Sequence, residues 1–338
     1  MNATPAFLTN PQDRDAALAR YLMPILPDLV RSEECLIRDL TSQYSFIQTL
    51  VQHIERFKGK RLRPALLLLS AHAFGGEAPL RCEVAALVEM LHLASLCHDD
   101  ILDEAATRRS VPTVNAQWGT KAAVMTGDIL FSRAFERLSK LDDPRPYKIL
   151  SRTARLICEG ELLQIGSRFD TGVDEDFYFD LIEKKTAVLF GAAAELGALL
   201  AGSTEEEARK LYSYARRTGM AFQIIDDCLD LLGTESTVGK SLGSDLKNGE
   251  LTLPVLHLLS NASASHKQEL LLMLKPGSGQ LTREGLRPYF DKYGSIQYAF
   301  NIAHTEIQRG RDELSFLPAS VACTALKELP DYVLARNS

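Results

Sequence analysis

The feature that most constrains the fold of this chain is a series of long segments whose apolar residues recur every three or four positions. This spacing places apolar side chains on one face of an α-helix, whereas a half-buried strand would alternate apolar and polar residues. Ala, Leu and Glu, which favour helices, are abundant in these segments. The segments that carry the pattern are 64–74, 82–104, 121–141, 149–166, 174–202 and 205–233. The sequence therefore predicts an all-α protein.

Several of these segments are longer than 20 residues and apolar on most faces, as expected for the inner helices of a large bundle. Turn-forming residues separate the helical segments, and none of the separators has the length and composition of a flexible linker. The separators are 74–79, 142–146, 233–250 and 275–282. We therefore predict one domain over residues 1–338, without a solenoid repeat.

The composition limits the partners that the chain can have. The 46% hydrophobic and 24% charged residues are typical of a globular protein with a substantial core, and the net charge of −6 argues against nucleic acid as a partner. Six scattered cysteines without a C-x-x-C pair indicate buried, reduced thiols, and the N-terminus has no targeting pattern, so we expect a cytoplasmic protein. No apolar run reaches the roughly 18 residues of a membrane span, so any membrane contact should be peripheral.

A short acidic motif, D-D-x-x-D, occurs at residues 99–103 and again at 226–230. Residues four apart share a helix face, so Asp99 projects beside Asp103, and the second motif repeats this geometry. One copy alone could be a solvated acidic helix end, but both follow strongly apolar helix, where like charges are costly. Two such faces directed at each other would form an oxygen-lined pocket, and Mg²⁺ is its natural occupant because it shares its ligands with substrate phosphates.

Basic residues occur in compact groups near these motifs, and a metal-bound diphosphate needs such cations to neutralise its remaining charge. Each group alone is more typical of a solvated surface, and only the clustering of the groups around apolar helices and acidic motifs favours anion binding. His92 lies two turns before Asp99 on the same face, where it could bind the same anion or be a core residue; we assign His98 a structural role. The basic groups are Lys60, Arg61 and Arg63; Arg108 and Arg109; Lys184 and Lys185, which precede Thr186; and Lys240 and Lys247.

Taken together, these motifs resemble those of the all-trans isoprenyl (polyprenyl) diphosphate synthases, over about residues 50–260. The matching segments are GKRLRP (59–64), HLASLCHDDILDEAATRR (92–109), GELLQI (160–165), EKKTAVLF (183–190), FQIIDDCLDLLG (222–233) and GKSLGSDLKNGELTLP (239–254). The final LPDYVLARNS resembles the tail of longer-chain members. Ser110 stands where the family usually has Gly, which alters a tight turn without removing a ligand.

The resemblance implies a single helical bundle around a deep central cavity, usually a homodimer, which joins isopentenyl diphosphate to an allylic diphosphate such as farnesyl or geranyl diphosphate. It implies that three Mg²⁺ ions are bound by Asp99, Asp100, Asp103, Asp226, Asp227 and Asp230. It implies that isopentenyl diphosphate is bound by Lys60, Arg63, His92 and Arg109. It implies that the allylic substrate is bound by Arg108, Lys185, Thr186, Gln223, Lys240 and Lys247. The residues implied in catalysis are Asp99, Asp103, Arg108, Lys185, Asp226 and Lys240.

The implied reaction is ionisation of the allylic diphosphate, condensation with isopentenyl diphosphate and loss of a proton. A terpene cyclase is an alternative, but the second motif keeps its first aspartate and is not of the Asn/Ser/Glu type, which favours elongation. A non-catalytic subunit of a two-component synthase should lose carboxylates, whereas this chain retains all six. A phosphohydrolase of the HD type would explain His98-Asp99 but not the second acidic motif.

The residues one turn before the first motif bear on product length. Ala94 and Ser95 lie roughly 6–7.5 Å below the metal site on a helix that rises about 1.5 Å per residue, and the resemblance makes this helix a cavity wall. Short-chain members tend to place aromatics there, whereas both residues are small here, and Met90 beyond them is flexible. We therefore expect a product of about C30–C50. The nearer alternative is the C20 product of a geranylgeranyl diphosphate synthase, if a bulky residue from another helix closes the floor.

Overall fold

A computed structural model of the chain describes residues 11–57, 59–75, 78–232, 243–275 and 282–335. Apart from one short hairpin, these residues form helices, which confirms the predicted all-α class. The N-terminal half contains α1 (Pro11–Leu22), η2 (Met23–Ile25), α2 (Leu26–Leu40), α3 (Ser45–Glu55), α4 (Leu62–Ala73), α5 (Arg81–Leu102), α6 (Val114–Trp118), α7 (Thr120–Leu138) and α8 (Pro144–Gly166). The C-terminal half contains α9 (Glu175–Ile182), η3 (Glu183–Ala187), α10 (Val188–Leu200), α11 (Glu205–Leu232), α13 (Ser244–Lys247), α14 (Leu253–Asn261), α15 (Ala264–Met273), α16 (Arg283–Tyr293), α17 (Ser295–Asp312) and α18 (Val321–Leu334).

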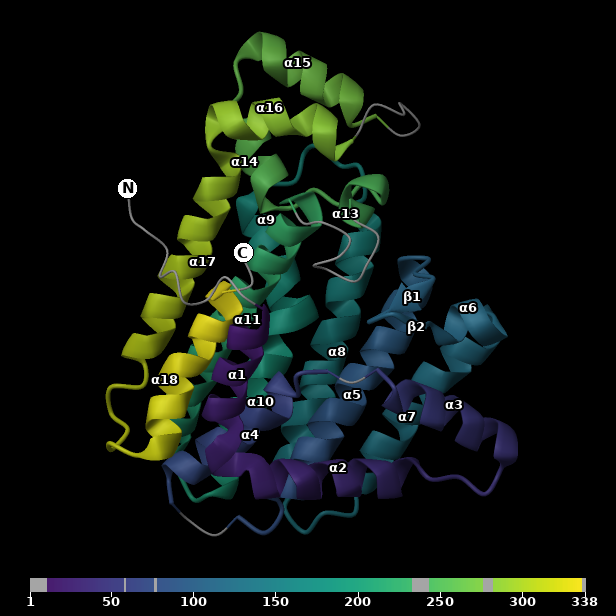
Figure 1. Cartoon of the computed structure of the whole chain (residues 1–338), viewed down its shortest axis with the longest axis vertical. Helices are drawn as coiled ribbons and strands as arrows, with labels where there is room; N and C mark the ends of the chain where they lie inside the picture. Colours follow the sequence, from purple (N-terminus) through teal and green to yellow (C-terminus); the bar gives the residue numbers. More distant parts are fainter. Residues whose placement is uncertain (1–10, 58, 76–77, 233–242, 276–281, 336–338) are drawn as a thin grey trace.

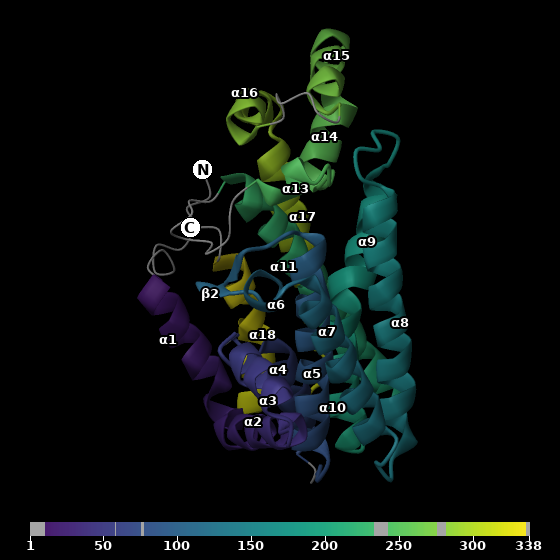
Figure 2. The same cartoon turned by 90° about the vertical axis from the view of Figure 1, so that its right-hand side faces the viewer.

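The core is built around helices that are apolar on nearly every face, as the sequence predicts. α10 packs against α4, α8 and α11, and α5 packs against α2, α4 and α7. The molecule is elongated, with α15 and α16 at one end of its long axis and α2 across the other (Figure 1). Figure 2 shows α8 and α9 along one side and α1 on the opposite side. Both acidic motifs lie on long core helices, α5 and α11, which gives them a rigid support.

The predicted segment 174–202 is helical from Glu175 to Leu200 but not uniform, because α9 passes through the π-helical turn η3 before it continues as α10. Such wider turns are frequent at functional sites. Gly160 of α8 allows η3 to approach closely, since a Cβ at this position would lie 2.7 Å from the backbone nitrogen of Lys185. The glycine therefore determines how near Lys185 can lie to α8.

The helix of the first acidic motif ends at Leu102, and a hairpin of β1 (Thr107–Arg108) and β2 (Val111–Pro112) follows. Its turn residues, Arg109 and Ser110, have φ angles of 52° and 63°. Both central residues of a type I′ hairpin turn need this left-handed region. Ser110 therefore takes the backbone conformation that Gly prefers, and the tight turn is retained without it.

Two further predictions concern membrane-spanning helices and the burial of the cysteines. No described helix combines the length and the hydropathy that a membrane crossing requires. The cysteines form no disulfide, but they are not uniformly buried as expected, because Cys158 on α8 is exposed.

Asp28 connects three helices at a distance from the acidic motifs. This α2 residue is 4% exposed and accepts hydrogen bonds from His72 Nε2 of α4 at 2.6 Å and from Arg81 Nε, at the start of α5, at 2.7 Å. Burial raises the pKa of Asp28, but the hydrogen bonds from Arg81 and His72 outweigh it and leave the pKa below its usual range. The carboxylate should therefore stabilise the fold.

Asp28→Asn is expected to lower the free energy of unfolding by about 3 kcal/mol, because it removes the buried carboxylate that pairs with Arg81. Urea denaturation measures this difference. Because folding lowers the pKa of Asp28, its contribution is present at neutral pH and is lost as the pH falls through the folded value, so both proteins should converge in acid. As a control, Arg31→Ala removes a 70% exposed partner 4.0 Å from Asp28 and should cost under about 0.5 kcal/mol. Equal losses in both variants would contradict this assignment.

Candidate active site

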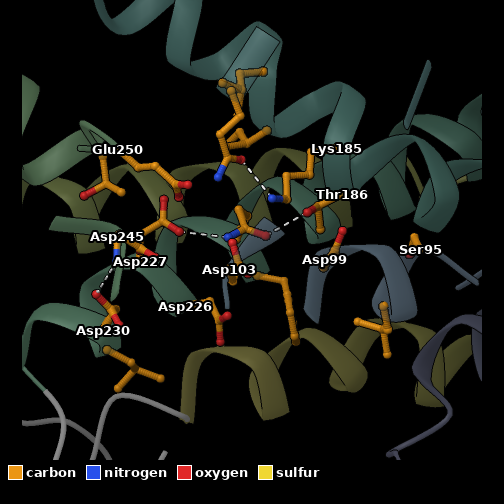
Figure 3. Close-up of a pocket in the computed structure, with 18 of the residues that line it drawn as sticks. Ser95, Asp99, Asp103, Lys185, Thr186, Asp226, Asp227, Asp230, Asp245 and Glu250 are labelled. Carbon is orange, nitrogen blue, oxygen red and sulfur yellow. Dashed lines mark hydrogen bonds between the residues drawn. The ribbon is translucent and has the colours of Figure 1, made fainter. Parts of the chain in front are cut away.

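A cavity of about 770 Å³ lies between the helices that carry the two acidic motifs. Figure 3 shows carboxylates of both motifs around the same space, with Lys185 and Thr186 of η3 at its edge. The predicted site residues that line the cavity are Lys60, Arg63, His92, Ser95, Asp99, Asp103, Arg108, Arg109, Lys185, Thr186, Gln223, Asp226, Asp227 and Asp230. Most of the predicted site is therefore brought together in one cavity.

The remaining predicted residues are placed differently. Asp100 is buried behind the cavity wall and Lys247 is exposed on α13, and neither lines the cavity. Ala94 and Met90 are fully buried in the core, so Ser95 is the predicted chain-length residue that reaches the cavity. Lys240 lies outside the described residues.

The first acidic motif ends α5, so that Asp99 lies in the last turn and Asp103 follows as the C-cap residue. Oδ1 of Asp99 is buried and accepts no hydrogen bond from the described residues. Burial raises the pKa of Asp99, and Lys185 and Arg108 oppose this effect. A buried carboxylate oxygen without a donor is the kind of atom that a cation would stabilise.

The middle aspartate of this motif holds an arginine. Arg108 donates from Nε and Nη2 to Oδ1 of Asp100, at 2.8 and 2.7 Å. The pair is almost fully buried, with side-chain exposures of 12% for Arg108 and 3% for Asp100. Asp100 therefore fixes the guanidinium of Arg108 at the cavity wall.

Lys185 is a second buried cation that acts on the first motif, since its charge opposes the effect of burial on Asp99. Its Nζ donates to Gln164 Oε1 at 2.8 Å and to Glu161 Oε2 at 3.1 Å, both on α8. Burial alone would lower the pKa of Lys185, but the carboxylates of Asp99 and Glu161 outweigh it and raise the pKa above its usual range. Burial also raises the pKa of Glu161 to about 7, even with Lys185 beside it. The ammonium is thus charged and held between two acidic groups.

The three aspartates of the second motif have different surroundings. Asp226 lines the cavity. Asp227 accepts a hydrogen bond on each oxygen, from Tyr178 Oη at 2.6 Å and from Gln223 Nε2 at 2.8 Å, and burial raises its pKa to about 7. Asp230 accepts from the backbone amides of Gly243 and Ser244, at 3.1 and 3.3 Å, and so holds the start of α13.

On the other side of the cavity, Arg63 and His92 form a buried pair. Nη1 of Arg63 lies 3.1 Å from Nε2 of His92, and its guanidinium carbon lies 4.6 Å above the ring of Phe190. Burial, followed by the Arg63 charge, holds the pKa of His92 well below its usual range, while burial lowers the pKa of Arg63 to about 10. His92 is therefore neutral, and its Nε2 accepts from Arg63 while Nδ1 carries the proton.

Two arginines at the loop before α4 have different partners. Arg109 donates to the carbonyl of Phe57 at 2.8 Å and passes so close to Gly59 that a Cβ there would lie 2.5 Å from its Nη1. Arg61 instead donates twice to Glu33, at 2.8 and 3.0 Å, and also to Glu89. Its charge is thereby used in packing α4 against α2 and α5.

The donor set of the cavity suits Mg²⁺, because carboxylate oxygens from both motifs border one space and Oδ1 of Asp99 lacks a donor. Among the described residues, no three acidic, His or Cys side chains lie close enough to hold an ion by themselves. An ion bound here would complete its shell with water and substrate phosphate, which is how Mg²⁺ is commonly held in proteins.

Several polar residues that line the cavity were not predicted from the sequence. These residues are Glu161, Gln164, Tyr178, Asp245 and Glu250. The spacing of Glu161 and Gln164, three residues apart in the segment GELLQI, could have identified them as neighbours on one helix face. The position of Tyr178 depends on the packing of α9 against α11, for which the sequence gives no local signal.

Comparison with known proteins places these features in a family. The family described as polyprenyl synthetase matches residues 44–284. A short chain isoprenyl diphosphate synthase of Methanothermobacter thermautotrophicus is 37% identical over 290 residues, covering 85% of this chain and 89% of that protein. Heptaprenyl diphosphate synthase component 2 of Geobacillus stearothermophilus is 34% identical over 310 residues, covering 92% of this chain and 96% of that protein.

A solved structure is similar over almost the whole fold. The polyprenyl synthase of Caulobacter crescentus, crystallised with calcium and isoprenyl diphosphate, superposes with a TM-score of 0.89. It is 30% identical in sequence, and the match covers 95% of this chain and 98% of the other.

Proposed function

Because the chain belongs to the polyprenyl synthetase family and is a prenyltransferase, we propose that it extends an allylic diphosphate with isopentenyl diphosphate to an all-trans product of about C30–C50. The observation that carries this proposal is the convergence of both acidic motifs and the buried cation of Lys185 on one cavity. A diphosphate could be held there from both sides of the cavity.

In this proposal, Lys185 and Arg108 bind the diphosphate of the allylic substrate and neutralise the charge that develops as it leaves. Bound Mg²⁺, held by Asp99, Asp103, Asp226 and Asp230, would supply Lewis-acid stabilisation of the same leaving group. Arg63, Arg109 and neutral His92 would hold isopentenyl diphosphate, whose double bond attacks the allylic carbocation. A proton is then lost to the released diphosphate, and the apolar walls exclude water that would otherwise quench the cation.

The proposed product length is supported by the position of Ser95. This small side chain lines the cavity one turn below Asp99, so it leaves space for a growing chain. The relatives named above range from short-chain to heptaprenyl synthases, so the family alone does not select a length. The nearer alternative remains a C20 product.

We also propose that the enzyme is a cytoplasmic homodimer that uses Mg²⁺ and contacts membranes peripherally when it releases product. Exposed apolar side chains on α7 and α8, including Met125 and Leu162, are consistent with self-association. The second candidate is a heteromeric synthase, because the Geobacillus relative is named as component 2. Size measurement of the purified chain, with and without a co-expressed partner, separates the two.

Incubation of the purified chain with Mg²⁺, farnesyl diphosphate and labelled isopentenyl diphosphate should yield products of about C30–C50 by mass spectrometry. Ser95→Phe is expected to shorten these products, because a ring would fill the space that the serine leaves, whereas Ser95→Ala should not change them. Failure to elongate, alone or with a partner subunit, contradicts the proposed function. Wild-type products that stop at C20 contradict only the proposed length.

A further inference from the structure

We infer that Arg61 and Glu89 are positioning residues for isopentenyl diphosphate, and that they act through the loop that carries Lys60 and leads to Arg63. We base this inference on the proposed function, because it concerns the part of the cavity proposed to bind that substrate. Arg61, which the sequence groups with the binding cations, is thereby given a role other than contact with substrate.

The guanidinium of Arg61 is held by two carboxylates from different helices. Its Nε and Nη2 donate to the two oxygens of Glu33 on α2, at 3.0 and 2.8 Å, and its Nη1 donates to Oε1 of Glu89 on α5 at 2.5 Å. The side chains of Arg61 and Glu89 are only 17% and 6% exposed. A forked, charge-assisted contact of this kind fixes geometry in a way that the single ammonium of a lysine cannot. Arg61 therefore ties the start of α4 to both neighbouring helices.

The backbone of Arg61 lies in the left-handed region, with φ 51° and ψ 35°. A residue other than Gly adopts this conformation at an energetic cost and keeps it where the surrounding structure imposes it. The ion pairs with Glu33 and Glu89 are contacts that can impose it. Because α4 begins at the next residue, Leu62, the conformation of Arg61 sets the direction in which the chain enters the helix.

The loop around Arg61 forms a wall of the cavity. Lys60 and Arg63 both line the cavity, and residues 59–61 also line a second pocket of about 390 Å³ on the side of α1 and α2. A segment with open space on two sides has few packing contacts to set its position. The ion pairs of Arg61 are therefore well placed to fix where Lys60 lies.

Glu89 connects this loop to the helix that carries His92. The two residues are three apart on α5 and so share a helix face, and Nε2 of His92 lies 3.1 Å from Nη1 of Arg63. Burial lowers the pKa of Arg63, and the carboxylate of Glu89 opposes this effect. One buried carboxylate thus holds Arg61 and also stabilises the charge of Arg63.

The direction of the effect of Glu89 on substrate binding separates positioning from charge. A carboxylate near an anion site repels a diphosphate, so Glu89→Gln would strengthen binding if only charge mattered. Binding would also become stronger if Arg61 contacted the diphosphate directly, because the substitution removes a competing acidic partner. If Glu89 positions the loop, the same substitution weakens binding.

Glu89→Gln is therefore expected to raise the KM for isopentenyl diphosphate by about 10-fold, while the KM for farnesyl diphosphate and kcat change by less than about 3-fold. Arg61→Lys keeps the charge but loses the fork, so it should raise the same KM by a similar factor. The double variant should be about as impaired as either single variant, because both substitutions break one contact. Initial rates with labelled isopentenyl diphosphate, at saturating farnesyl diphosphate and Mg²⁺, measure these values.

Asp28→Asn is the matched control. The cluster of Asp28, His72 and Arg81 joins the same three helices, α2, α4 and α5, but at the C-terminal end of α4, and none of its three residues lines the cavity. This variant should lower stability without changing the KM for isopentenyl diphosphate. An equal rise of that KM would mean that general packing of the three helices is responsible, and it would overturn the inference.

Glu33→Gln provides a test even if the buried variants do not fold, because the side chain of Glu33 is 40% exposed. It should raise the KM for isopentenyl diphosphate by about 3-fold, less than Glu89→Gln. A KM that falls, or stays within about 1.5-fold of the wild type, in Glu33→Gln and in the folded variants of Arg61 and Glu89 contradicts the inference. A wild-type enzyme that forms no product would instead contradict the proposed function, so the two failures are distinguishable.

Discussion

Asp99→Ala is expected to lower kcat by about 1000-fold or more, because it removes the buried oxygen best placed to bind a cation at the leaving diphosphate. The fold should survive, since the substitution relieves a buried carboxylate that has no hydrogen bond on Oδ1. Steady-state kinetics measure the loss, and circular dichroism with thermal denaturation checks the fold.

Asp312→Ala is a suitable control, because Asp312 is an exposed aspartate at the end of α17. It should change neither rate nor stability. Activity of Asp99→Ala within 10-fold of the wild type would remove Asp99 from the proposed metal site.

Lys185→Ala has the second largest expected effect, a loss of about 100–1000-fold in kcat. The ammonium compensates Asp99 and Glu161, and its removal raises the pKa of both carboxyl groups further. Because only the ionised carboxylate binds a cation well, the acidic limb of the pH–rate profile should move to higher pH. Measurement of kcat between pH 6 and pH 9 tests both the size of the loss and the direction of the shift.

Lys184→Ala provides the comparison for this variant. The neighbouring lysine pairs with Asp180, which is 55% exposed on α9, and does not line the cavity. Its removal should change kcat by less than about 2-fold. A loss of activity equal to that of Lys185→Ala would mean that the π-helical turn, and not the ammonium, is what matters.

The helices and the two acidic motifs could be predicted because their signals are local. Periodicity fixes which residues share a helix face, and the motif spacing places the carboxylates of 99–103 and 226–230 on long core helices. The structure confirms the all-α class and brings most of the predicted residues to one cavity. Local spacing could not reveal that α5 ends at Leu102 and that a hairpin holds the arginine pair.

The contacts that could not be predicted join residues that are distant in sequence. Both ion-pair partners of Arg61 lie 28 residues away, in opposite directions, and Tyr178 lies 49 residues from Asp227. Composition and spacing cannot show which distant carboxylate pairs with a given basic side chain. Arg61 and Arg63 therefore form one basic group in the sequence, although packing pairs Arg61 with two carboxylates and Arg63 with His92.

The hairpin after α5 has a consequence for how the two substrates meet. Arg108 is fixed by Asp100, and Arg109 is fixed by the carbonyl of Phe57, although the two residues are adjacent. If each guanidinium binds the diphosphate proposed for it, these two contacts set the separation between the two headgroups. The alignment of electrophile and nucleophile is then built into the packing of the hairpin against α5 and the loop before α4, and it needs no large domain movement.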